Sequence, residues 1–204
     1  MPPIKIPFKR PSGLKNPTLV IIATEGQKTE KKYFEDLKQI NKNTKIHIEV
    51  LKRTDPSKSA PKYVLNQLID FKAKYKLQKH DSLWMVIDFD RWRISIPEVA
   101  KECARRKFKL AVSNPAFEIW LLLHYKSMDQ YTQEEINNFN GNNLKLLLRQ
   151  ILGSYNPSKL NSSDFIPYTK TAITRAKNLD IDLSHRWPHT VGSRVYQLVE
   201  ILIT

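Results

Sequence analysis

The stretch from Leu83 to Asp90 reads L-W-M-V-I-D-F-D, an apolar run that ends in two carboxylates separated by one residue. A second apolar run, from Thr18 to Thr24, ends directly before Glu25. Continuous apolar runs of this length are typical of strands buried on both faces of a parallel sheet. Because parallel strands present their ligands at their carboxyl ends, the two runs predict a site that contains Glu25, Asp88 and Asp90.

Helical and strand-like patterns alternate over the first 125 residues of the chain. In chain order after the first strand, we expect a helix at 29–40, a strand at 46–50, a helix at 59–75, a strand at 83–87, a helix at 97–107 and a strand at 109–112. A further helix is expected to start with Asn114 as its cap and Pro115 in its first turn. This order predicts an α/β fold with a small parallel sheet flanked by helices.

After Tyr125 the apolar residues recur only at helical spacing, in 144–152, 165–179 and 195–202, and loops are expected at 137–143 and 154–163. We therefore expect three regions. Residues 1–16 form a loose, basic, proline-rich arm, residues 17–125 form the α/β core, and residues 126–204 form a helical C-terminal extension packed on the core.

The charge of the chain indicates a negatively charged partner. Its 204 residues include 34 Lys and Arg against 20 Asp and Glu, a formal net charge of +14. Such a surface attracts phosphates, so nucleic acid is the expected partner, and its binding should weaken with salt. The alternative is a generically basic soluble protein. The candidate nucleic-acid contacts are Lys28, Arg91, Arg93, Lys170, Arg175, Arg186 and Arg194.

Several classes of protein are excluded or disfavoured. Cys103 is the single cysteine, so an internal disulfide is impossible, which fits a reducing cytoplasm. The longest apolar stretch, 119–123, is far too short to span a membrane, and the basic arm lacks the apolar centre of a signal peptide. Gly26-Gln27-Lys28-Thr29 lacks the spacing of a phosphate-binding loop, which argues against nucleoside-triphosphate hydrolysis.

The carboxylates suit a divalent metal. In extended backbone, Asp88 and Asp90 point to the same side, and two such charges need a counter-ion. Mg²⁺ or Mn²⁺ would supply it and would polarise a phosphate oxygen. The alternative is that Arg91 and Arg93, which follow directly, neutralise the pair.

Two glutamates are further candidates for chemistry. Glu25 is predicted to bind the metal or move a proton, the alternative being a solvated loop residue. Glu118 lies among apolar residues at 117–123 and is costly to bury unless it is paired or bound to metal; the alternative is that it faces solvent. Glu30 is interpreted as surface charge or as support for the site. His124 is interpreted as a helix-end residue rather than a ligand.

Four stretches resemble the RloB-like family of Toprim-related proteins. They are I-I-A-T-E-G-Q-K-T-E-K-K-Y-F at 21–34, W-M-V-I-D-F-D-R at 84–91, A-V-S-N-P-A-F-E-I-W-L-L-L-H-Y at 111–125 and, more loosely, P-H-T-V-G-S-R-V-Y-Q-L-V at 188–199. The resemblance implies a Toprim-like fold in which Glu25, Asp88 and Asp90 gather around magnesium.

The resemblance also implies a function. RloB-like proteins are associated with bacterial defence against phage by abortive infection, commonly beside a partner ATPase, and related Toprim effectors resemble nucleases, some directed at transfer RNA. We therefore expect a magnesium-dependent nuclease that favours RNA, with Glu25 as base or ligand and Glu118 completing the site. The alternatives are nucleotidyl transfer, as in primases, and a non-catalytic nucleic-acid-binding or sensor subunit.

Overall fold

A five-stranded sheet forms the centre of the part of the chain that the structure describes. The computed structural model describes residues 4–10, 17–40, 45–53, 55, 58 and 60–203. The strand order is β3-β2-β5-β6-β7, and β7 runs antiparallel to β6 while the other neighbours are parallel. These strands are β2 (Thr18–Thr24), β3 (Ile46–Val50), β5 (Ser82–Asp88), β6 (Lys109–Asn114) and β7 (Gly192–Ser193).

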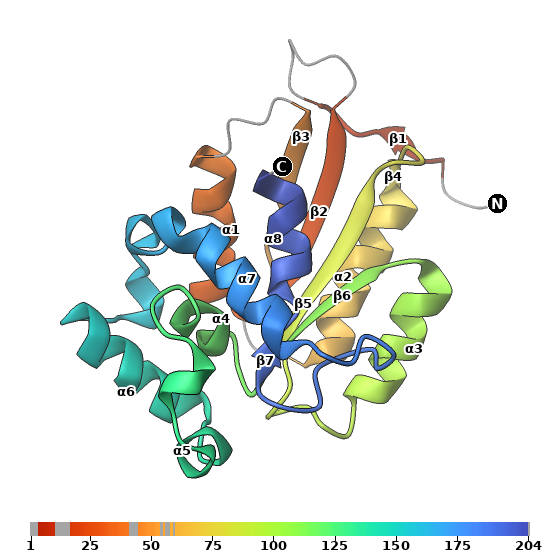
Figure 1. Cartoon of the computed structure of the whole chain (residues 1–204). Helices are drawn as coiled ribbons and strands as arrows, with labels where there is room; N and C mark the ends of the chain where they lie inside the picture. The colour runs from red at the N-terminus through yellow and green to blue at the C-terminus, as the bar shows by residue number, and fades with distance from the viewer. Residues whose placement is uncertain are drawn as a thin grey trace.

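Helices connect the strands and make up most of the C-terminal part (Figure 1). The α-helices are α1 (Thr29–Ile40), α2 (Pro61–Lys74), α3 (Ile96–Arg106), α4 (Glu118–Leu122), α5 (Gln133–Asn137), α6 (Gly141–Leu152), α7 (Thr169–Leu179) and α8 (Val195–Ile203). Short 3₁₀ turns lie at η1 (Met128–Gln130), η2 (Pro157–Lys159), η3 (Ser162–Asp164) and η4 (Ile166–Tyr168).

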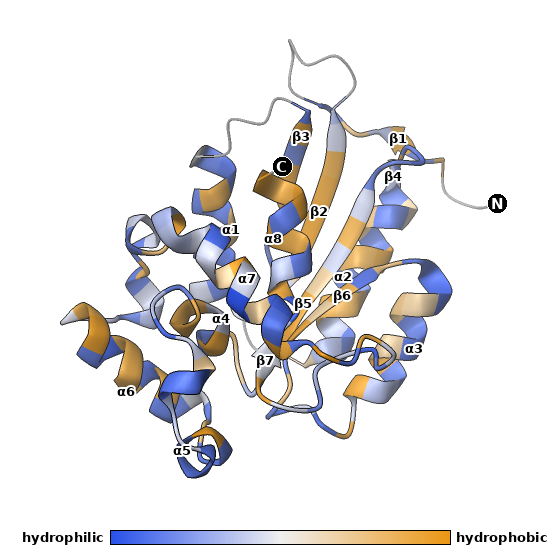
Figure 2. Cartoon of the chain, viewed as in Figure 1, coloured by the Kyte–Doolittle hydropathy of each residue, from blue (hydrophilic) through white to orange (hydrophobic). Residues whose placement is uncertain are grey.

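Alternate side chains of the strands divide the interior into two cores. Leu19 and Ile21 of β2 belong to one core, together with buried residues of α2 and α3. Val20 and Ile22 belong to the other, with buried residues of α1, α4, α6, α7 and α8. Figure 2 shows the apolar strands between helices whose outer faces are largely hydrophilic. The result is a three-layer arrangement in which side chains pointing to opposite faces of the strands are covered by different helices.

The predicted fold class is confirmed, because the structure is α/β with a mostly parallel sheet between helices. Two expectations about the end of β6 and its neighbours are wrong. The C-terminal region contributes a strand, β7, which pairs with the end of β6. Asn114 does not cap a helix, because its backbone belongs to β6 opposite Gly192; α4 begins four residues later, at Glu118.

The expectation of a loose N-terminal arm is wrong for residues 6–8. β1 (Ile6–Pro7) pairs with β4 (Tyr75–Lys76), and the ring centroid of Phe8 lies 5.4 Å from that of Phe71. Residues 1–3 and 11–16 of this arm, and Ser59 at the expected start of a helix, lie outside the described residues. One hydrophobic core cluster contains residues from both 17–125 and 126–204, so these two parts of the chain pack together. The division of the chain into three regions stays a prediction.

Candidate metal and phosphate site

Five carboxylates lie at the carboxyl-terminal edge of the sheet. Glu25 directly follows β2, Asp88 is the last residue of β5, Asp90 lies two residues further on, and Glu118 opens α4 after β6. Glu30 is the second residue of α1. Because β2, β5 and β6 are neighbours, the topology brings these residues to one edge. We call the five residues the carboxylate cluster.

Glu25 is buried and held by two donors. It is 6% exposed. Its Oε2 accepts a hydrogen bond from the backbone N–H of Asp88 at 3.1 Å, and its Oε1 accepts one from Nε1 of Trp92 at 2.7 Å. The backbone carbonyl of Glu25 accepts a hydrogen bond from the guanidinium of Arg53. Glu25 is therefore not a solvated loop residue, and its side chain joins the end of β2 to the end of β5.

Glu30 turns inward and requires a glycine beside it. It is 6% exposed, and its Oε1 accepts a hydrogen bond from the backbone N–H of Gly26 at 2.9 Å. A Cβ atom on Gly26 would lie 1.6 Å from Oε2 of Glu30. Only a residue without a side chain leaves room for this carboxylate, so the interpretation of Glu30 as surface charge is wrong.

The two aspartates differ in how their oxygens are satisfied. Oδ1 of Asp88 accepts a hydrogen bond from the backbone N–H of Phe117 at 2.8 Å. The backbone N–H of Asp90 donates to the carbonyl of Pro115 at 3.1 Å, which fixes this loop against the chain that follows β6. Oδ1 of Asp90 is buried and has no hydrogen-bond partner among the described residues. A buried carboxylate oxygen without a donor is costly and indicates a missing ligand or solvent partner.

Glu118 receives its partners from the C-terminal region. It is 5% exposed, its Oε1 accepts a hydrogen bond from the hydroxyl of Tyr155 at 3.3 Å, and Nζ of Lys145 lies 3.7 Å from the same oxygen. A Cβ built on Gly141 would lie 4.0 Å from both Oδ2 of Asp90 and Nζ of Lys145. The first turns of α6 therefore border the carboxylate cluster, and Glu118 does not face solvent.

Burial and mutual repulsion raise the pKa values of Glu25, Glu30, Asp88 and Glu118. Burial, followed by the charges of Glu118 and Glu25, raises the pKa of Glu30 to about 7. Burial and the charges of the other four carboxylates raise the pKa of Asp88 well above its ordinary value. Burial also raises the pKa of Glu25 and of Glu118, although Arg91 and Lys145, respectively, oppose this. These carboxyl groups are thus buried close enough to disfavour one another's ionisation.

The oxygen atoms of the carboxylate cluster are of the chemical type that binds a hard divalent cation. All are carboxylate oxygens, the preferred ligands of Mg²⁺ and Mn²⁺, and the partnerless Oδ1 of Asp90 is free to bind one. Within the described residues, however, no group of three or more His, Cys, Asp or Glu side chains is arranged to hold one ion. The structure therefore brings the predicted ligands Glu25, Asp88 and Asp90 to one edge without converging them on one point, and the metal stays a prediction.

The candidate nucleic-acid contacts divide into two groups. The side chains of Lys28, Arg91, Arg93, Lys170 and Arg186 are exposed, and their role stays a prediction. Arg175 is partly buried and donates a hydrogen bond to the carbonyl of Leu123 at 2.9 Å, which gives it a structural contact.

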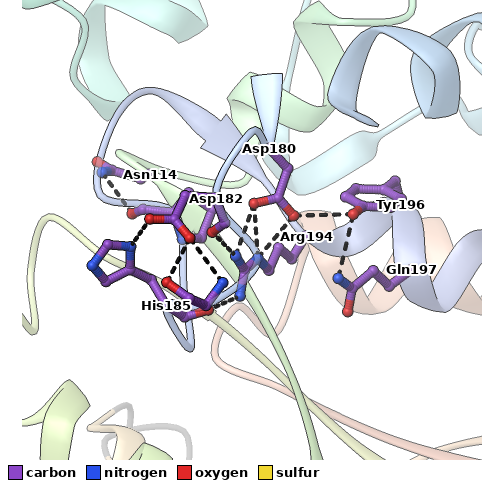
Figure 3. A network of polar contacts seen from close by, with 9 residues as sticks. Asn114, Asp180, Asp182, His185, Arg194, Tyr196 and Gln197 are labelled. Atoms are coloured by element: carbon purple, nitrogen blue, oxygen red, sulfur yellow. Dashed lines mark hydrogen bonds and ion pairs between the residues drawn. The ribbon is translucent and has the colours of Figure 1, made fainter. Parts of the chain in front are cut away.

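Arg194 cannot serve as a surface contact. It is 5% exposed, its Nε lies 2.9 Å from Oδ2 of Asp180, and its Nη2 lies 2.8 Å from Oδ1 of the same residue. The guanidinium also donates to the carbonyls of Asp182 and His185 (Figure 3). The prediction that Arg194 contacts nucleic acid is therefore wrong, because its donors are already used inside the protein.

Three residues of the site were not anticipated. Trp92 follows the two aspartates closely, but its bond to Glu25 depends on how the loop folds back. Lys145 and Tyr155 come from segments far from Glu118 in sequence, so no spacing could indicate them. His124, interpreted from the sequence as a helix-end residue, lies two residues after the end of α4. It is buried, its Nδ1 lies 2.9 Å from the carbonyl of Trp120, and burial lowers its pKa to about 4.

Fold and site together define an α/β protein, consistent with a Toprim-like fold, that gathers acidic side chains at the carboxyl ends of its parallel strands. The model of the RloB-like protein family matches residues 20–202, and the chain belongs to this family. No curated protein and no solved structure matches the chain. Among the described residues, no helix is long and apolar enough to cross a membrane.

Proposed function

We propose that this protein is a metal-dependent phosphodiesterase that cleaves nucleic acid, with RNA, including transfer RNA, as the favoured substrate. One observation carries the proposal: five carboxylates with an unmatched buried oxygen gather at one sheet edge of a chain whose net charge is +14. Acidic side chains at such density repel a polyanion unless a cation lies between them. A positive surface around a metal-binding acidic centre would attract a phosphodiester and present it to the metal.

The residues have separable roles in this proposal. Asp88, Asp90 and Glu25 would hold Mg²⁺ or Mn²⁺, which, when bound, neutralises their charge and polarises a phosphate oxygen. Glu25 is oriented by the indole of Trp92, and burial raises its pKa, which makes it a stronger proton acceptor than an exposed glutamate. Lys145 of α6 forms an ion pair with Glu118, and in this proposal its ammonium would also contact a phosphate of the substrate.

The biological role is proposed from the family alone. RloB-like proteins are associated with abortive infection, so we propose that cleavage makes the protein a toxic effector of phage defence in the cytoplasm, with an ATPase as possible partner. Expression of the wild type should then slow growth of the host, and a variant without cleavage should not.

The strongest alternative is a non-catalytic nucleic-acid-binding or sensor subunit. One finding favours it: the described part of the chain contains no group of three or more His, Cys, Asp or Glu side chains arranged to hold a metal ion. Such a subunit would bind RNA or DNA with the same salt dependence but leave it intact. Binding alone therefore does not separate the two functions.

Cleavage by the purified protein tests the proposal. Labelled transfer RNA, unstructured RNA and DNA are incubated with Mg²⁺, with Mn²⁺ and with a chelator, and the variant Asp88→Asn/Asp90→Asn is treated in parallel. We expect cleavage of at least the RNA substrates with metal, and none with chelator or with the variant. Intact substrates that are nevertheless retained by the protein would establish the binding subunit. Adding nucleoside triphosphates tests for strand extension, the outcome that would indicate nucleotidyl transfer.

A further inference from the structure

A cavity of about 720 Å³ adjoins the carboxylate cluster between α2, α3 and the loop after β5. Asp90 lines it, and so does Trp92, whose Nε1 donates to Glu25. The cavity therefore shares one residue with the cluster and is connected to another through a hydrogen bond. Its volume is in the range of sites that enclose small organic ligands.

The lining of this cavity suits a flat, uncharged ring better than a phosphate. Its uncharged wall includes Pro61, Leu65, Val99 and the indole of Trp92. Its wall carries three cations, Lys62, Arg91 and Arg93, and three carboxylates, Asp90, Glu98 and Glu102, the last already paired with Arg105 and Arg106. An anion would meet charges of both signs here, whereas a nucleobase gains stacking surface as well as hydrogen-bond donors and acceptors.

The rim of the cavity has an unusual apolar residue. Ile94 is 98% exposed, and Arg93 next to it lies over the ring of Phe89, with its guanidinium carbon 5.4 Å from the ring centroid. Both residues line the cavity. A planar base entering here would cover the exposed isoleucine and stack against the guanidinium or the indole, the usual surfaces for unpaired bases.

We propose that this cavity binds the base of an unpaired nucleotide whose phosphate lies at the carboxylate cluster. This inference rests on the proposed function, and it specifies the substrate class as single-stranded or locally unpaired nucleic acid. A paired base cannot enter, because it is stacked inside its duplex until it is extruded.

Binding of mononucleotides tests the cavity without any cleavage. Calorimetric titration with AMP, GMP, CMP and UMP is compared with ribose 5-phosphate, which has the phosphate but no base. We expect at least one nucleotide to bind, and to bind about tenfold or more tighter than ribose 5-phosphate. Equal binding of all five compounds, or of none, would overturn the proposal.

Substitutions in the cavity lining test whether the nucleotide binds there. Arg93→Ser/Ile94→Ser removes a cation and an isoleucine from the rim, and Ser95→Trp fills the cavity from its wall. Each should weaken nucleotide binding about tenfold or more. The matched control is Lys101→Ser/Ile181→Ser, which removes the same kinds of side chain from exposed positions outside the cavity. Nucleotide binding unchanged in both cavity variants, or weakened equally in the control, would place the base elsewhere.

A cleavage assay distinguishes failure of the cavity proposal from failure of the proposed function. A labelled strand is offered alone and annealed to its complement, and we expect about tenfold or faster cleavage of the unpaired form, a preference lost in Arg93→Ser/Ile94→Ser. Equal cleavage of both forms would overturn the cavity proposal and leave the nuclease standing. If neither form is cleaved, the nuclease proposal fails, and the mononucleotide titration still decides whether the cavity binds a base.

Discussion

Two buried polar regions of this protein, the region around Arg194 and Asp180 and the carboxylate cluster, differ in how their charges are satisfied. Arg194 and Asp180 form an ion pair whose remaining donors and acceptors are met by backbone carbonyls and by the hydroxyl of Tyr196 (Figure 3). Among the described residues, the carboxylate cluster has five acids, one clear ion pair to Lys145 and an unmatched oxygen on Asp90. The first region is complete as a structural support, whereas we propose that a cation completes the second.

This difference predicts opposite consequences for substitution. In the Arg194 region, removing one charge should cost stability and leave chemistry intact. In the carboxylate cluster, removing one charge should relieve repulsion and abolish chemistry.

Glu25→Ala should lower cleavage by at least ~100-fold, the scale for losing a positioned acid–base group. Affinity for RNA should be kept or slightly raised, because one negative charge is removed from a chain of net charge +14. Single-turnover cleavage and filter binding measure the two quantities separately. Cleavage, toxicity and phage protection that all survive the substitution would contradict the nuclease proposal.

Arg194→Met should lower the free energy of unfolding by about 3–5 kcal/mol, because it leaves Asp180 buried without its cation. Denaturant unfolding measures this loss. The double variant Arg194→Met/Asp180→Leu removes both charges and should recover much of it. Comparable destabilisation by Glu118→Gln, which removes a charge from the cluster, would remove the contrast between the two regions.

The pH dependence of stability tests the repulsion within the cluster. Folded Glu30, with a pKa of about 7, retains a proton that the unfolded chain loses near pH 4.5, so the free energy of unfolding should fall as pH rises between these values. The loss is of the order of 3 kcal/mol. Buried His124 acts in the opposite direction between about pH 4 and 6.5, because only its unfolded form is protonated there.

The difference between the wild type and Glu30→Gln isolates this effect from His124. Denaturant unfolding at several pH values should show that the variant gains stability relative to the wild type as pH rises toward 8. Parallel pH profiles for the two proteins would mean that Glu30 titrates normally and that the cluster is not crowded.

Gly26→Ala should displace the side chain of Glu30 from its place in the carboxylate cluster. The new Cβ would collide with the Glu30 carboxylate, which must then leave the N–H of Gly26 without its acceptor. We expect a loss of about 1–3 kcal/mol in the free energy of unfolding. The matched control is Gly141→Ala, where the nearest atom would be 3.6 Å away, an ordinary contact. Equal effects of the two substitutions would show that Glu30 adapts freely.

The sequence predicts the framework of the fold because its central strands have a strong pattern. β2 and β5 are continuous apolar runs buried from both sides, which few other structures produce. β7 is two residues long and has no periodicity of its own; it exists because Gly192 and Ser193 lie beside the end of β6. Asn114 resembles a helix cap in sequence, but its Nδ2 donates to the carbonyl of Pro188 while its backbone stays in the sheet.

The site was predictable only where strand ends determine it. Glu25, Asp88 and Asp90 follow from the rule that parallel strands carry ligands at their carboxyl ends. The sequence does not separate the two interpretations of Glu30, surface charge and support for the site, because the space that admits its side chain depends on Gly26 and on the turn between them. Lys145, Tyr155 and the buried position of Arg194 depend on packing of the C-terminal helices, which single-sequence periodicity does not describe.

The most direct test of the central claim is the effect of Mg²⁺ on unfolding of the wild type and of Asp88→Asn/Asp90→Asn, with Na⁺ at matched ionic strength as control. A ligand that binds only the folded state should raise the free energy of unfolding, by about 2.7 kcal/mol at a hundred times its Kd. We predict a Mg²⁺-dependent rise in the wild type and none in the double variant. The same rise in both proteins, or no rise in the wild type, would contradict a metal site in the carboxylate cluster.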